Sequence, residues 1–156
     1  MEESTRSDFS ARLLCLGNDI LADDALGILV AETLRGRLPE TVDVVSSMES
    51  GLRLLDHLVG VPRVIVIDSV QTGSAPPGTI FVLREEDISY SPGPSGHYMG
   101  LFETLALGKR LDMPVAEDVL VIAVEAGDCL TIGGSLTPAV ERAIPEVARR
   151  VVELVG

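Results

Sequence analysis

Short apolar runs alternate along the chain with segments in which apolar residues recur every three or four positions. Continuous apolar or β-branched runs of this length predict strands, here over 13–16, 42–45, 63–68, 79–83 and 119–124. The three-to-four-residue spacing predicts amphipathic helices over 24–38, 51–59, 99–110 and from 138 onward. The chain therefore predicts a regular succession of strands and helices joined by short links.

Proline, glycine and polar residues mark the expected boundaries. Pro39 is expected to end the first helix. Asp68 is expected to end the strand over 63–68. Residues 86–98 are rich in proline and glycine, which predicts an irregular surface loop. Thr137-Pro138 predicts the start of the last helix, because Thr is a frequent N-cap and Pro fits the first turn.

This order of elements predicts the fold class. Alternating strands and helices with short links favour a mostly parallel sheet with helices on both faces, a three-layer α/β/α arrangement. A chain of 156 residues suits a single domain, so one α/β domain is expected over 1–156. The polar and acidic start of the chain predicts a flexible extension over residues 1–11.

Composition narrows the possible partners. The chain has 24 acidic and 12 basic residues, a formal net charge of −12, which argues against nucleic acid and against anionic membranes as partners. The amino terminus lacks the apolar stretch of a signal peptide, and no apolar run reaches the ~18 residues of a membrane span. A cytoplasmic location without membrane contact is expected. The two cysteines do not make a disulfide framework.

Three polar residues stand where chemistry is expected in such a fold. In open α/β sheets, ligands bind beyond the carboxyl ends of the strands, at a switch point in strand order. Asp24, Asp68 and His97 occupy such positions and should face one crevice. Two carboxylates and an imidazole suit a divalent ion such as nickel or zinc, and three protein ligands leave coordination positions open. The sequence therefore predicts a metal-contacting site without selecting the metal.

Each of these residues also has a simpler interpretation. Asp23 or Asp24 could cap the following helix, and their adjacency allows one to cap while the other faces the crevice. Asp68 could be a turn residue that binds nearby amides, and His97 could be solvated. A reactive thiol at Cys129 is also conceivable, although no base partner is evident.

Three segments carry a resemblance to a known family. LCLGNDILADDALG resembles the Gly-Asn-containing opening of the hydrogenase maturation proteases. These endopeptidases trim the C-terminal extension from the nickel-containing large subunit of NiFe hydrogenases. SGHYMGLFETL is similar to the family's histidine segment, and GGSLTPAVERAI to the opening of its last helix. The resemblance extends over residues 13–155.

The resemblance implies roles for the three residues. It places the family's metal-contacting acid at Asp24, its second acid at Asp68 and its histidine at His97, so these would be both catalytic and metal-contacting. The implied partner is a NiFe hydrogenase large-subunit precursor that already carries nickel, although zinc or another divalent ion could occupy the site in vitro. Either a carboxylate-activated water or a metal-bound hydroxide could cut the peptide bond.

The chain departs from the family pattern at two turns. Cys15-Leu16-Gly17-Asn18 replaces the common Gly-x-Gly-Asn, and Ser47-Met48-Glu49 stands where a Gly-Gly-Thr-like turn is expected. Asn18, Glu49 and Gly51 are predicted to bind substrate, although Glu49 could instead be a helix-start carboxylate. The changed second turn supports an alternative, a non-proteolytic accessory subunit that binds a hydrogenase. A small-ligand-binding α/β domain is a third hypothesis.

Overall fold

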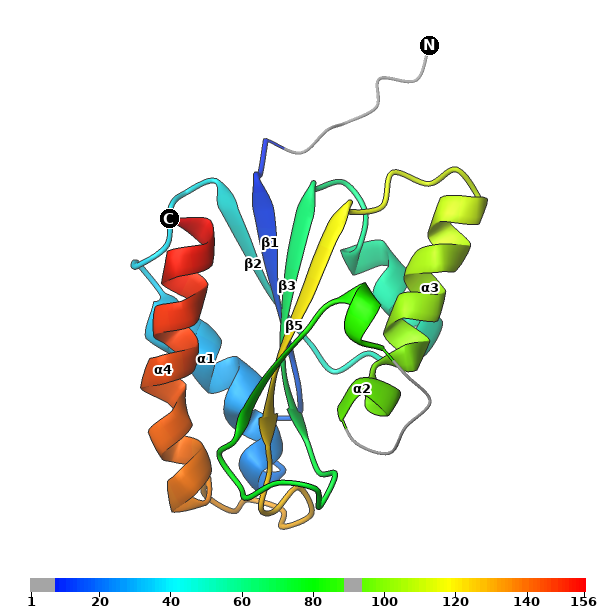
Figure 1. Ribbon diagram of the computed structural model, residues 1–156. Helices are drawn as coiled ribbons and strands as arrows, with labels where there is room; N and C mark the ends of the chain where they lie inside the picture. Colours follow the sequence, from blue (N-terminus) through cyan, green and yellow to red (C-terminus); the bar gives the residue numbers. More distant parts are fainter. Residues whose placement is uncertain (1–7, 89–93) are drawn as a thin grey trace.

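A computed structural model describes residues 8–88 and 94–156 and shows a twisted sheet between two layers of helices (Figure 1). The strand order is β2-β1-β3-β5-β4, and only the edge strand β4 runs antiparallel to its neighbour. The strands are β1 (Ala11–Leu16), β2 (Val42–Ser47), β3 (Arg63–Val70), β4 (Ile80–Leu83) and β5 (Asp118–Glu125). The mostly parallel three-layer fold expected from the sequence is confirmed.

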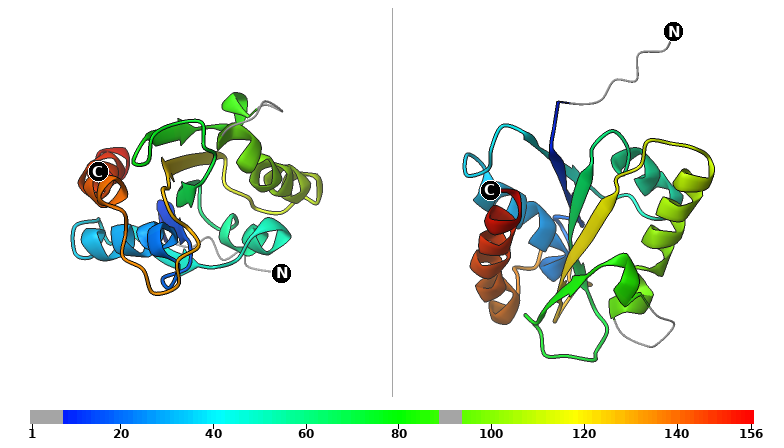
Figure 2. Two further views of the ribbon diagram at one scale, coloured as in Figure 1. Left: turned by 90° about the horizontal axis from the view of Figure 1, so that it is seen from below. Right: turned by 45° about the horizontal axis from the view of Figure 1, so that its top comes forward.

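Helices cover both faces of the sheet. Helices α1 (Leu26–Leu34) and α4 (Pro138–Val155) lie side by side on one face, and α3 (Met99–Arg110) lies on the other (Figures 1 and 2). A 3-10 helix, Gly51–His57, packs beside α3, and the short helix α2 (Pro94–His97) precedes α3. Two further 3-10 helices span Ala22–Ala25 and Glu85–Asp87.

The core divides into two apolar clusters because successive side chains of a strand point to opposite faces. In β1, Leu13 and Cys15 pack toward α1 and α4, whereas Leu14 and Leu16 pack toward α3. Strand β3 follows the same alternation and is buried on both faces. The continuous apolar runs arise from this double burial.

Several boundaries differ from the sequence prediction. The first helix is shorter than 24–38, because its opening turn is 3-10 and α1 ends at Leu34, before Pro39. Arg35 leaves the helical conformation and Gly36 adopts a positive φ, so these residues end the helix. Asp68 does not end its strand, since β3 continues to Val70 in register with β5.

Two further segments differ in kind. The expected helix over 51–59 is 3-10 from Gly51 to His57, and in it Leu54 is buried whereas Leu52 is 65% exposed. His97 ends the short helix α2 instead of lying in an irregular loop. Of the expected N-terminal extension, residues 1–7 lie outside the described residues, and Ala11 is already the first residue of β1.

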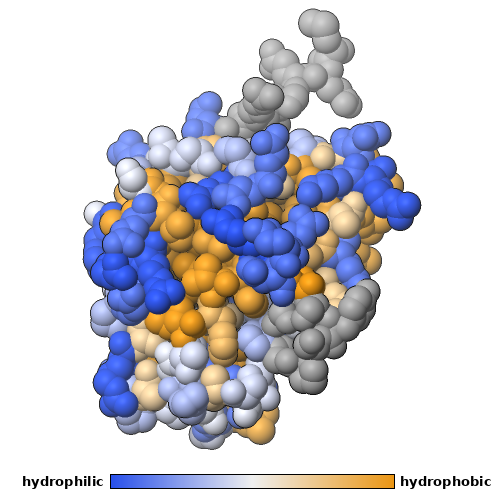
Figure 3. Space-filling view, in the orientation of Figure 1, coloured by the Kyte–Doolittle hydropathy of each residue, from blue (hydrophilic) through white to orange (hydrophobic). Residues whose placement is uncertain are grey.

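The surface seen in Figure 3 carries apolar side chains in the middle of the face, over β4 and beside α4. Val82 of β4 is 43% exposed. Within the described parts of the chain, no helix is both long enough and apolar enough to cross a membrane.

Candidate functional site

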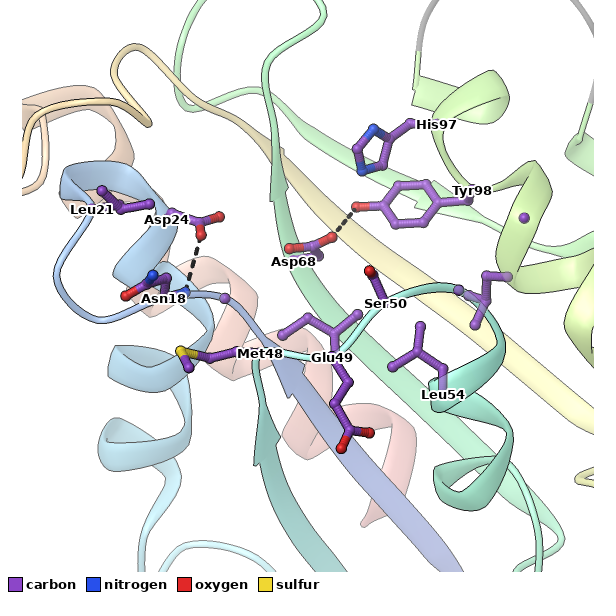
Figure 4. Close-up of a pocket in the computed structure, with 15 residues that line it drawn as sticks. Asn18, Leu21, Asp24, Met48, Glu49, Ser50, Leu54, Asp68, His97 and Tyr98 are labelled. Carbon is purple, nitrogen blue, oxygen red and sulfur yellow. Dashed lines mark hydrogen bonds between the residues drawn. The ribbon is translucent and has the colours of Figure 1, made fainter.

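A cavity of about 540 Å³ opens at the carboxyl ends of β1 and β3. The chain leaves β1 toward α1 on one face, whereas the connection after β3 leads to α3 on the other, so the cavity lies at a switch point of the sheet. Asp24, Asp68 and His97 all line it, and Figure 4 shows them on different sides of one space. The structure therefore brings the three predicted residues to one place.

Asp24 is held by short-range contacts with the turn after β1. The backbone N–H of Asn18 donates to its Oδ2 at 3.0 Å, and the same N–H lies 3.1 Å from its carbonyl oxygen. From β3, the Ser69 hydroxyl donates to Oδ1 at 2.9 Å. Among the described residues, each carboxylate oxygen thus has one donor and retains lone pairs for a ligand in the cavity.

Two glycines explain why this turn fits so closely around Asp24. Gly17 has φ +147°, and a Cβ there would lie 2.1 Å from the Asp24 carbonyl oxygen. A Cβ on Gly27 would lie 2.4 Å from the Leu16 carbonyl oxygen, so glycine lets the start of α1 approach the end of β1. Both glycines belong to the segment that carries the family resemblance.

Asp68 projects from β3 toward the α3 side of the sheet. The buried phenol of Tyr98 donates to its Oδ2 at 3.1 Å, and the Ser69 backbone N–H donates to Oδ1 at 2.9 Å. Burial raises the pKa of Asp68 to about 7, an effect that the two hydrogen bonds oppose and the nearby charge of Asp24 reinforces. Asp68 is therefore a carboxyl group that exchanges its proton near neutral pH.

His97 supplies the imidazole from the end of α2, across the cavity from Asp24 (Figure 4). Its ring makes an edge contact with the Tyr98 ring, with centroids 4.9 Å apart, and partial burial of the imidazole lowers its pKa. A neutral imidazole is the form that binds metal ions. Tyr98 thus contacts both His97 and Asp68.

The residues predicted to bind substrate also border the cavity. The side-chain oxygen of Asn18 accepts the Ile20 N–H at 3.1 Å and so shapes the turn. Glu49 lines the cavity, but its carboxylate points away from Asp68 (Figure 4), and its Oε2 lies 3.2 Å from His57 Nε2. Gly51 lines the cavity with φ +60°.

The adjacent carboxylate, Asp23, has a different environment. It is completely buried and accepts hydrogen bonds from the backbone N–H groups of Gly127, Asp128 and Thr137, at 2.7–2.8 Å. The Thr137 hydroxyl donates to it as well. Within the described chain, neither Asp23 nor Asp24 makes a side-chain cap to the helix that follows it. Asp23 instead ties the 126–137 loop and the start of α4 to the 3-10 helix.

Two contributors to the site escaped the sequence analysis, Ser69 and Tyr98. Each directly follows a predicted residue in the sequence, but neighbouring strand residues point to opposite faces, so Ser69 would not be expected to assist Asp68. It assists Asp24 from the other face. Cys129 lies near Ser69, and burial raises its pKa to about 11, which disfavours a reactive thiolate.

The arrangement offers ligands without a closed metal cage. Among the described residues, no three His, Cys, Asp or Glu side chains converge closely enough to hold a metal ion by themselves. The described residues that line the cavity include carboxylates and an imidazole but neither Lys nor Arg. The donor set is chemically suited to a divalent cation that arrives with another molecule.

Comparison with known proteins gives consistent matches. A model of the hydrogenase maturation protease family matches residues 28–154, a span that includes Asp68 and His97. Hydrogenase 2 maturation protease of Escherichia coli is 30% identical over 98 residues, which are 60% of each chain. The hydrogenase expression/formation protein HoxM of Azotobacter vinelandii is 32% identical over 89% of this chain and 68% of its own. The matches thus span 60% and 68% of the length of these two relatives.

Solved structures extend the similarity to nearly the whole fold. The hydrogenase maturating endopeptidase HybD from E. coli superposes with a TM-score of 0.76 at 25% identity, covering 94% of this chain and 91% of that one. The HybD protein from Thermococcus kodakarensis, at 22% identity and a TM-score of 0.72, shares the fold over 95% of this chain and all of its own.

Proposed function

The chain belongs to the hydrogenase maturation protease family, and from this premise we propose that it removes the C-terminal extension from the nickel-loaded precursor of a NiFe hydrogenase large subunit. The observation that carries the proposal is the single cavity into which Asp24, Asp68 and His97 project at the switch point of the sheet. A cytoplasmic site of action is part of the same proposal.

Nickel enters this proposal as part of the substrate. The cavity presents carboxylate oxygens and an imidazole nitrogen, with neither Lys nor Arg in the part of its lining that the structure describes. A cation carried by the precursor would find complementary charge and both oxygen and nitrogen donors there, whereas a precursor without metal would bring no positive charge to Asp24 and Asp68. Metal recognition would thus precede cleavage. Zinc or another divalent ion could fill the same donor set in vitro.

The raised pKa of Asp68 suggests how the metal could be coupled to hydrolysis. Hydrolysis of a peptide bond needs a base to take a proton from the attacking water. At a pKa of about 7, Asp68 is partly protonated at neutral pH. A cation within a few ångströms favours the ionised carboxylate, so a loaded precursor would generate the base at the site where its peptide bond lies.

The proposal is tested by mixing the protein with nickel-loaded and nickel-free precursor and following the loss of mass by mass spectrometry. Cleavage of the loaded form alone is expected. Asp68→Asn and His97→Ala should each reduce the rate at least about 1,000-fold, since each removes a donor to the cation. Asp56→Asn, which alters an exposed carboxylate outside the cavity, is the matched control and should retain full activity.

The opposite results are equally clear. No cleavage of any cognate loaded precursor, or full activity in both cavity variants, would refute the proposal. Stable binding to the mature, trimmed large subunit would favour the accessory-subunit alternative, because a protease should release its product. The altered turn that supports this alternative lines the cavity but leaves Asp24, Asp68 and His97 in place.

A further inference from the structure

Large apolar side chains are exposed around the cavity to an unusual degree. Among the described residues, six large hydrophobic side chains are more than half exposed, and five of them lie on the segments that follow β1, β2 and β5, at the edge of the sheet where the cavity opens. We call these five the apolar rim: Ile20 (53% exposed), Met48 (72%), Leu52 (65%), Leu130 (82%) and Ile132 (76%). The sixth, Leu111, is 61% exposed at the far end of α3.

The rim has two arms. The first is Met48 and Leu52, on the segment after β2, and the second is Ile20, Leu130 and Ile132, on the segments after β1 and β5. Met48 lines the cavity itself, and Leu52 directly follows Gly51, which also lines it. On the other arm, Ile20 lies between the lining residues Asn18 and Leu21. The loop after β5 joins this arm through the bridge between Leu21 and Ile132 and through a 2.7 Å bond from the Gly133 N–H to the Ile20 carbonyl.

Hydrogen bonds to Asp23 and Asp128 also hold the loop after β5 in place. Asp23 binds the backbone N–H groups of Gly127 and Asp128, and Asp128 accepts the N–H groups of Leu130 and Thr131 at 2.9 and 3.1 Å. The loop that exposes Leu130 and Ile132 is thus tied to the segment that supplies Asp24. A cluster of exposed apolar side chains on an anchored support is typical of a protein-interaction surface.

We propose that the apolar rim is the docking surface for the metal-loaded precursor, and that it contacts apolar side chains flanking the precursor's cation. This inference rests on the proposed function and names the surface by which the substrate is held. Charge selects the occupant, because an acidic cavity with exposed apolar side chains on the neighbouring segments complements an apolar protein surface that carries a cation. A second copy fits poorly, since two chains of net charge −12 would bring their acidic cavities together.

The rim makes its contacts away from the reacting bond, so it should affect binding more than catalysis. The test uses the double variants Leu130→Ser/Ile132→Ser and Met48→Ser/Leu52→Ser, with Leu111→Ser as a control of the same chemistry and similar exposure. For cleavage of the nickel-loaded precursor, each double variant should raise KM about tenfold, while kcat stays within about twofold. Leu111→Ser should change neither constant.

A second measurement separates docking from catalysis. The Kd for nickel-free precursor, measured by calorimetry, should also rise about tenfold in the double variants, because rim contacts do not require the metal. If the wild type cleaves loaded precursor and the double variants match Leu111→Ser in KM and Kd, the proposed docking role of the apolar rim is refuted and the protease function stands. If no precursor is cleaved but the double variants weaken binding, the docking surface stands and the protease function fails.

Two other results would overturn the docking surface. One is the absence of any binding of nickel-free or nickel-loaded precursor by the wild type. The other is a self-association that the double variants abolish in sedimentation experiments without any change in precursor binding, which would assign the rim to a second copy. Each variant should unfold at the same temperature as the wild type, since the substituted side chains are exposed.

Discussion

Asp23 and Asp24 are consecutive residues of one 3-10 helix, yet they belong to different regions of the molecule. Asp23 is completely buried among donors from the 126–137 loop, whereas Asp24 borders the cavity and has one described donor on each oxygen. A carboxylate whose lone pairs are all used can only hold structure together. One with free lone pairs beside a cavity can bind a ligand.

Asp68 extends this comparison. Two donors do not compensate its burial, as the pKa of about 7 shows. A buried, poorly compensated charge costs folding free energy, and such residues concentrate at functional sites. Substitution of Asp23 should therefore lower the stability of the protein, whereas substitution of Asp24 or Asp68 should lower its activity.

The largest expected effect is on the activity of Asp24→Asn. An amide keeps the size of the side chain but is a much weaker ligand than a carboxylate, so kcat/KM for loaded precursor should fall about 1,000-fold. The free energy of unfolding, measured with urea, should change by no more than about 1 kcal/mol. A tenfold loss or less, in a protein of unchanged stability, would place the metal-contacting acid elsewhere.

The next effect is on the stability of Asp23→Asn. The new amide group would point N–H donors at the backbone donors of the 126–137 loop, leaving them unsatisfied in the interior. The free energy of unfolding should fall by about 3 kcal/mol. Asp128→Asn is the control, since Asp128 caps the same loop at the surface and should matter much less. Equal losses in the two variants would contradict the importance of burial.

A comparable effect should appear in the pH dependence of stability. The pKa of Asp68 is raised in the folded protein, so its protonated form is stabilised by folding. Its contribution is complete below pH about 4 and is lost as the pH rises through about 7. In chelator-treated protein, Asp68→Asn should therefore gain on the order of 4 kcal/mol over the wild type between pH 4 and 8. A constant difference across this range would contradict the raised pKa.

The smallest expected effect belongs to Tyr98→Phe. The phenol hydroxyl lowers the pKa of Asp68 by donating to its carboxylate, so its removal should move that pKa above about 7. Titration of the Asp68 carboxyl carbon by NMR would measure the change. Tyr98→Phe should cost about 1 kcal/mol of stability, the usual value for one hydrogen bond. An unchanged titration curve would show that the Tyr98 hydroxyl does not act on Asp68.

Local patterns in the sequence predicted most of the elements. Double burial of the central strands leaves long apolar runs, and helix α3 begins and ends as its periodicity indicates. The predicted end of the first helix was wrong because the backbone leaves the helical conformation at Arg35 although the apolar spacing continues. The predicted helix type over Gly51–His57 was wrong because α- and 3-10 helices repeat apolar residues at similar spacing. The position of Asp24, Asp68 and His97 relative to the strand ends singled them out, the family resemblance implies the same three residues, and the structure places them around one cavity.

The sequence by itself therefore determined the fold class, the order of elements and the three residues at the switch point. Only the tertiary structure decided which of two adjacent aspartates is buried, that Ser69 holds Asp24, and that Tyr98 holds Asp68. The physical reason is the distance along the chain. Asp23 meets partners 104 to 114 residues away, and no local spacing or propensity encodes which side chains meet once the sheet closes.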